Sequence, residues 1–82
     1  MTDMTKEEIL NKTKAILAVV KPAVNQEDIT FDSVLVKDLG LDSLSNLLMG
    51  LALEREFGIK IEDEAGFVTV NDVCEYILKS IS

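Results

Sequence analysis

The spacing of apolar residues in positions 70–81 constrains the fold of this chain more than any other sequence feature. Apolar side chains recur there three or four positions apart, which places them on one face of an α-helix. They are Val70, Val73, Cys74, Ile77, Leu78 and Ile81. Such a helix must bury that face against another element, so the rest of the chain has to supply packing partners. Asn71 is predicted to cap this last helix.

The first quarter of the chain predicts a second amphipathic helix. Thr5 and Glu8 stand three residues apart, the spacing of a capping box. The residues on the apolar face of this predicted helix are Ile9, Leu10, Thr13, Ile16, Leu17 and Val20. Pro22 ends the pattern, because the residue before a proline is pushed out of the helical conformation. We therefore expect a helix from about Lys6 to about Val20.

A third helix is predicted over residues 42–57. Asp42 and Ser43 are both suited to its start, and Gly58 is suited to the left-handed position just past its end. Later, residues 62–67 have room for one helical turn at most. The short segment between the second long helix and the last one is therefore expected to be a vestigial helix.

Residues 21–41 form a long connection without a sustained hydrophobic period. One helical turn is expected around residues 26–29. Four apolar residues of this connection are expected to lie across the core: Phe31, Val34, Leu35 and Leu39. The sum is an all-α fold, a small bundle of three main helices plus a short or vestigial one, in a single domain spanning residues 1–82.

The charge balance and the missing residue types exclude several functions. A net charge of −7 repels nucleic acid and anionic lipid and favours partners with basic patches. The chain has no histidine, which excludes ordinary triad and histidine-ligated metal chemistry. Its one cysteine, Cys74, is expected to be a buried, inert thiol in a reducing compartment. No signal peptide or membrane-length apolar run is evident, so a cytoplasmic protein is expected.

The stretch from Asp38 to Leu44, Asp-Leu-Gly-Leu-Asp-Ser-Leu, carries the strongest functional signal. Taken alone it predicts a glycine turn followed by a capped helix. Leu41 precedes the cap and Leu44 directly follows the serine, so both are not expected to face the core. Together with Leu53 to Ile59 and the Thr69-Val70 pair, this stretch resembles the acyl carrier protein family over nearly the whole chain.

The resemblance implies a carrier rather than an enzyme, with neither catalytic residues nor a metal site. The serine matching Ser43 would bear a 4′-phosphopantetheine arm, transferred from coenzyme A by a separate phosphopantetheinyl transferase. Gly40, Asp42 and Leu44 would complete the attachment motif, with Asp42 also contributing to magnesium-assisted transfer. The position itself suits this role, because a helix start exposes the serine and favours the negative phosphodiester.

The chain departs from common fatty-acid carriers after the serine. No charge lies between Leu44 and Leu53, and four leucines there are expected to form an exposed surface for partner enzymes: Leu44, Leu47, Leu48 and Leu51. The alternative is that they pack against the long connection. Gly50 stands where a branched residue is usual, which indicates either a longer acyl pocket with Phe57 and Ile59 or a close contact between helices.

Two further departures indicate a specialised carrier. Residues 61–70 are shorter than in common carriers and contain Gly66, and Lys37 stands where an acid is frequent. The expected cargo is a fatty or lipid-linked acyl chain, presented by a monomer to acyl-transferring and acyl-modifying enzymes. The alternatives are a carrier of polyketide, peptide or aminoacyl intermediates, and an unmodified interaction module. The least favoured alternative, an enzyme, would use a loose cation cluster of Glu62, Asp63 and Glu64.

Overall fold

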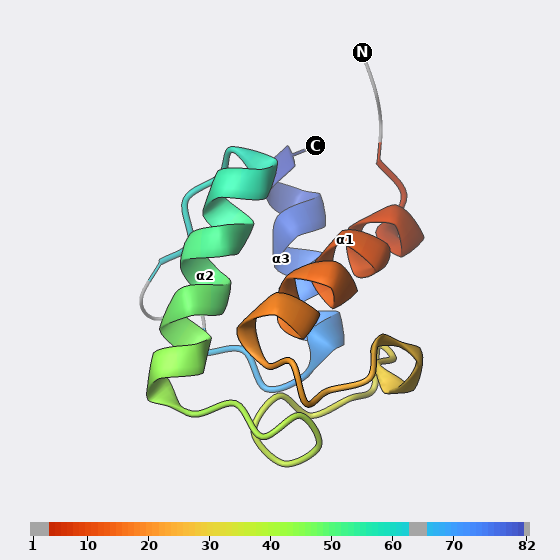
Figure 1. Ribbon diagram of the computed structural model, residues 1–82. Helices are drawn as coiled ribbons and strands as arrows, with labels where there is room; N and C mark the ends of the chain where they lie inside the picture. Colours follow the sequence, from red (N-terminus) through yellow and green to blue (C-terminus); the bar gives the residue numbers. More distant parts are fainter. Residues whose placement is uncertain (1–3, 63–65, 82) are drawn as a thin grey trace.

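Three helices pack around one core in the computed structural model, which describes residues 4–62 and 66–81. They are α1 (Lys6–Val20), α2 (Ser43–Phe57) and α3 (Val70–Ile81), with a 3₁₀ turn, η1 (Gln26–Asp28), in the long connection. Helix α1 packs against both α2 and α3, and the 21–41 connection closes one end of the bundle (Figure 1). The predicted all-α bundle is confirmed. The described residues contain no strand, and their one isolated bridge joins Val34 and Thr69.

The predicted ends of α1 and α2 are confirmed by their capping geometry. The Thr5 hydroxyl accepts a hydrogen bond from the Glu8 amide, and the Glu8 carboxylate accepts one from the Thr5 amide. Gly58 has a φ of 65°, a left-handed conformation that a residue with a Cβ rarely adopts. Its amide donates to the Glu54 carbonyl, which turns the chain back alongside α2.

The prediction that Asn71 caps α3 is wrong. The cap is Thr69, whose hydroxyl accepts from the Asp72 amide, while the Asp72 carboxylate accepts from the Thr69 and Val68 amides. The Asn71 amide instead donates to the carbonyl of Phe31 in the long connection. Helix α3 therefore begins at Val70, two residues earlier than a cap at Asn71 would allow, and the long connection binds its first two amides.

The core combines the two predicted helix stripes with side chains from the long connection and from α2. Its buried apolar side chains are Ile9, Leu10, Leu17, Ile29, Leu35, Leu39, Leu41, Met49, Leu53, Val70, Val73, Cys74 and Ile77. The Thr13 hydroxyl is buried among them and donates to the Ile9 carbonyl at 2.8 Å. Burial raises the pKa of the Cys74 thiol, which keeps it protonated, as expected for an inert cysteine. Phe31 and Val34 are partly buried, so the connection does lie across the core.

No helix within the described residues is both long and apolar enough to cross a membrane. Residues 59–62 and 66–69, on either side of the part left undescribed, contain no helix. Of the predicted cation cluster, Glu62 is exposed, whereas Asp63 and Glu64 lie outside the described residues. Across the ranges that the structure describes, no group of three or more potential metal ligands is found.

Candidate functional site

Ser43 stands at the exposed start of α2. The turn before it depends on Gly40, whose φ of 70° reverses the chain so that Leu41 is buried and Asp42 reaches the surface. Ser43 is then the first residue of the helix and is exposed. Leu41 is 2% exposed and Leu44 64%, which confirms that only one of them faces the core. The four predicted motif residues therefore meet at one corner of the molecule.

Asp42 is the N-cap of α2. Its carboxylate accepts a hydrogen bond of 2.8 Å from the Ser45 amide. This bond, aided by the Ser45 hydroxyl and by the charge of Lys21, holds the pKa of the Asp42 carboxyl below its usual range. Since the carboxylate is held by a helix amide, its orientation at the base of Ser43 is fixed.

The lowered pKa of Asp42 predicts an acid-sensitive contribution to stability. A carboxyl whose folded pKa is depressed stabilises the fold above its unfolded pKa, and the effect is lost as the pH falls through the folded value. Asp42→Asn should keep most of the neutral-pH stability, because asparagine caps helices as well as aspartate does. The variant should lose less stability than the wild type on acidification. Thermal unfolding midpoints from about pH 6 to about pH 2 measure this difference. Parallel pH profiles for the two proteins would contradict it.

The surroundings of Ser43 fit a phosphodiester. The first turn of α2 contains no acidic residue, and its leading amides have no carbonyl of the helix to bind. The positive end of the helix dipole lies there and favours an anion by about 0.3–1 kcal/mol. Since Ser43 is exposed, its hydroxyl is accessible to another protein.

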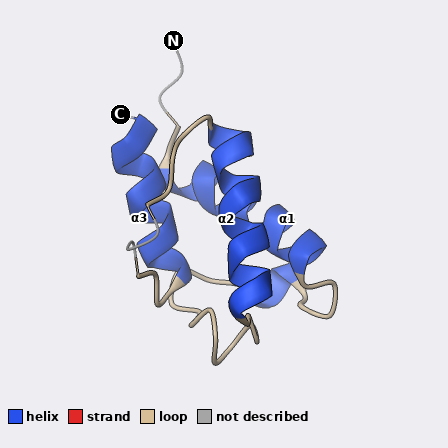
Figure 2. Cartoon of the chain, turned by 90° about the vertical axis from the view of Figure 1, so that its left-hand side faces the viewer, coloured by secondary structure: helices blue, strands red, loops and turns tan. Residues whose placement is uncertain are grey.

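A groove runs along α2 from Ser43. It has a volume of about 450 Å³, and its described lining residues are Ser43, Asn46, Leu47, Met49, Gly50, Leu51, Glu54, Ile61, Glu62, Gly66 and Phe67. One wall is α2 and the other is the chain that returns after Gly58 (Figure 2). The sequence interpretation found Gly50 but missed Glu54 and Phe67. The residues of α2 that line the groove follow Ser43 at helical spacing, so the sequence could have predicted this wall. No sequence pattern near residues 61–62 and 66–67 indicates that they form the other wall.

Gly50 opens the middle of this groove. Apart from its chain neighbours and the backbone of its own helix, a Cβ placed at Gly50 would have no heavy atom within 4 Å, so the alternative of a close contact with another helix is wrong. Phe57 and Ile59 do not line the groove. They pack partly buried against the core, beyond Glu54 along the chain. The three residues predicted for an acyl pocket are therefore not brought together.

The predicted leucine surface is exposed. Leu44, Leu47, Leu48 and Leu51 are 64%, 59%, 45% and 54% exposed, so they do not pack against the long connection. We call these four side chains the leucine ridge. The helix spaces them at three and four residues, which places them along one outward face of α2.

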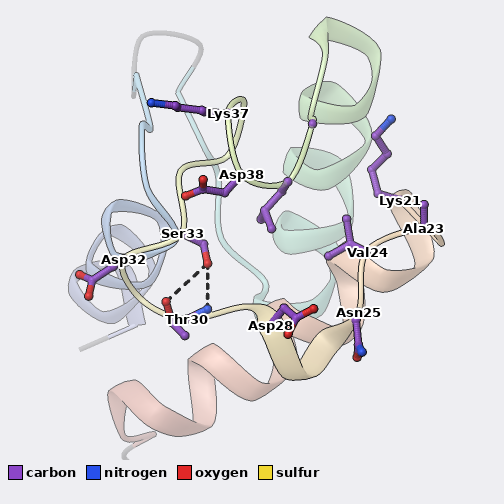
Figure 3. A pocket seen from close by; sticks show the side chains of 12 residues that line it. Lys21, Ala23, Val24, Asn25, Asp28, Thr30, Asp32, Ser33, Lys37 and Asp38 are labelled. Carbon is purple, nitrogen blue, oxygen red and sulfur yellow. Dashed lines mark hydrogen bonds between the residues drawn. The ribbon is translucent and has the colours of Figure 1, made fainter.

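A second, more polar hollow lies between the end of α1 and the long connection (Figure 3). Its volume is about 660 Å³. Within it the Ser33 hydroxyl accepts from the Thr30 amide at 2.9 Å, a contact that holds the connection in shape. Lys21 extends from the rim, away from Asp28 (Figure 3), and its Cε lies 4.0 Å from the position of a Cβ at Gly40.

Known proteins match the chain in both sequence and fold. The family described as "Phosphopantetheine attachment site" matches residues 9–77. An acyl carrier protein of Clostridium perfringens is 45% identical over 71 residues, covering 84% of this chain and 92% of that protein. An acyl carrier protein of Thermotoga maritima is 35% identical over 79 residues, covering 94% and 96%.

A solved structure gives the same fold. It is described as that of the thermally stable acyl carrier protein from Enterococcus faecalis, and it superposes with a TM-score of 0.77 at 33% identity. The match covers 94% of this chain and 99% of that one. The exposed serine at a capped helix start, the family match and the shared fold agree: this chain belongs to the acyl carrier proteins, phosphopantetheine-bearing carriers that are not enzymes.

Proposed function

We propose that Ser43 is the residue that bears the 4′-phosphopantetheine arm, and that the chain presents fatty or lipid-linked acyl intermediates to biosynthetic enzymes. The observation that carries the proposal is the exposed Ser43 hydroxyl at the first position of α2. Ser45, the other serine of α2, is only 8% exposed. The arm supplies a thiol that holds the acyl group as a thioester.

The chain's own residues account for the rest of the proposed role. Asp42 fixes the start of α2, so that Ser43 is presented to a transferase in one orientation. The helix dipole favours the negative phosphodiester that the transfer leaves. Cys74 takes no part, because its thiol is fully buried. The unpaired cysteine also supports our placing of the carrier in the cytoplasm.

The test is intact-protein mass spectrometry after incubation with coenzyme A, magnesium and a broad-specificity phosphopantetheinyl transferase. We expect a gain of one phosphopantetheine, and peptide mapping should locate it at Ser43. A gain located elsewhere would refute the assignment. With several transferases giving no gain, the unmodified interaction module would become the better hypothesis. A further measurement separates the cargo alternatives. Acyl donors of the fatty, polyketide and aminoacyl classes are offered to the cognate enzymes of the loaded protein, and the class that is transferred to the arm identifies the cargo.

We further propose that partner enzymes bind the leucine ridge. Leu48→Glu should lower kcat/KM of a partner enzyme about tenfold, because altering a residue at the water-excluded centre of an interface costs more than about 1 kcal/mol. Val19→Glu is the matched control, since Val19 is 79% exposed on α1 and lies outside the ridge. Steady-state kinetics with the phosphopantetheinyl transferase and one acyl-transferring enzyme measure both variants. Equal values for Leu48→Glu, Val19→Glu and the wild type would refute recognition through the ridge.

A further inference from the structure

The groove beside Ser43 ends at a carboxylate. Glu54 lies on the same side of α2 as Ser43 and Gly50, about 16 Å along the helix from the serine at 1.5 Å per residue. Its Oε2 accepts a hydrogen bond of 2.7 Å from the Ile61 amide on the opposite wall. This bond joins the two walls at the end of the groove far from Ser43, soon after the chain turns at Gly58. Figure 2 shows the returning chain beside α2.

The lining changes character along this length. Next to Ser43 the groove offers Leu47, Met49 and the open space at Gly50, which suit an alkyl chain. At the far end it offers the Glu54 carboxylate, Glu62 also lines it, and its described lining residues include no lysine or arginine. Neither acid appears among the ion pairs found within the described ranges, which are Lys6–Glu75 and Lys12–Glu56.

An alkyl chain that reaches Glu54 meets a barrier. Covering the carboxylate with methylene groups removes water from a charged group without replacing its hydrogen bonds, which is costly. Displacing the side chain instead breaks its bond to the Ile61 amide and leaves that amide unpaired. Before that point each buried methylene is favourable. The favourable free energy from burying each further methylene group therefore stops at Glu54.

We propose that Glu54 is a specificity-determining residue, which limits the length of acyl chain that the groove shelters. The inference rests on the proposed function, since the chain has to be carried from Ser43. Short and medium chains are shielded between Met49, Gly50 and Phe67. Longer chains leave their distal carbons in solvent. The carrier therefore discriminates by length through one polar contact rather than through the size of an apolar cavity.

The test measures thioester protection across a series of chain lengths. The full-length protein is loaded from acyl-coenzyme A donors from butyryl to palmitoyl, and cleavage by hydroxylamine is followed by mass spectrometry. For the wild type, protection should rise with each donor by up to about fourfold per buried methylene, and then level off. In Glu54→Leu it should continue to rise for at least one further donor. Unfolding midpoints of the same samples should follow the same order.

Three variants make the outcome decisive. Glu54→Gln keeps an acceptor for the Ile61 amide, so its loop stays in place, and its plateau should still move to longer chains. Glu56→Gln changes an exposed acid that pairs with Lys12 outside the groove, and should match the wild type. Gly50→Val fills the middle of the groove and should lower the protection of all longer chains.

Coincident length profiles for the wild type, Glu54→Gln and Glu54→Leu would overturn the inference, as would an unchanged profile for Gly50→Val. These failures differ from a failure of the proposed function. If the proposed function fails, either no donor gives a mass gain on any variant or peptide mapping places the gain on a residue other than Ser43, and in both cases there is no length profile for an acyl chain carried on Ser43. A loaded protein with a length-independent profile refutes only the role of Glu54.

Discussion

Ser43→Ala should abolish phosphopantetheine loading completely. The hydroxyl oxygen is the atom that would form the phosphodiester, and alanine offers none in its place. Loading by a transferase, measured as the mass gain of the intact protein, should therefore fall from one group per chain to none. The fold should survive, because Asp42 still caps α2 and alanine is the best helix-forming residue. The free energy of unfolding should change by less than about 0.5 kcal/mol.

Ser45→Ala is the matched control for this result. Ser45 lies two residues further along the same helix, but its side chain is turned inward and the residue is only 8% exposed. Loss of its hydroxyl should leave loading intact. Residual loading of Ser43→Ala would place the arm on another residue. Loss of loading in a folded Ser45→Ala would mean that the geometry around Asp42, rather than the Ser43 hydroxyl alone, decides transfer.

Leu53→Ala should destabilise the fold by about 2–5 kcal/mol. Leu53 is 0% exposed on the inner face of α2, so the truncation removes buried apolar surface and leaves a cavity. A domain of this size has a total stability of about 5–15 kcal/mol, so a large part of it would be lost. Urea unfolding followed by far-UV circular dichroism measures the change.

Leu47→Ala tests whether burial is the cause. It makes the same chemical change on the same helix, but Leu47 is 59% exposed on the leucine ridge. Its unfolding free energy should change by less than about 0.5 kcal/mol. If the two variants lost equal stability, the two faces of α2 would be wrongly assigned, and the ridge could not be a free surface.

The helices were predictable because their signals are local. The Thr5–Glu8 capping box and the glycine after Phe57 act within a few residues of the helix ends that they define. The site corner was predictable for the same reason, since Gly40 to Leu44 are consecutive. The exposure of the leucine ridge also followed from spacing, because one helix cannot bury so many faces at once.

The cap of α3 and the groove were not predictable, because distant residues decide them. Thr69 and Asn71 are both good caps in isolation. In the fold the carbonyls of Ser33 and Phe31 accept from the Val70 and Asn71 amides, and the helix begins at Val70 with Thr69 as its cap. Likewise Ile61 and Phe67 become the second wall of the groove only through the path of the chain after Gly58. No periodicity in the sequence records that path.

The hydrogen bonds between the long connection and the start of α3 have a consequence for how the molecule opens. Leu35 donates to the Val68 carbonyl, and Val70 donates to the Ser33 carbonyl. These bonds close a ring of chain that contains the whole of α2. Breaking this ring releases a long loop of chain. We therefore expect the ring to open only when the whole domain unfolds cooperatively. The amides of Leu35 and Val70 should then be among the slowest to exchange with solvent deuterium. The amides on the exposed face of α2 should exchange faster, through local opening that leaves the ring closed.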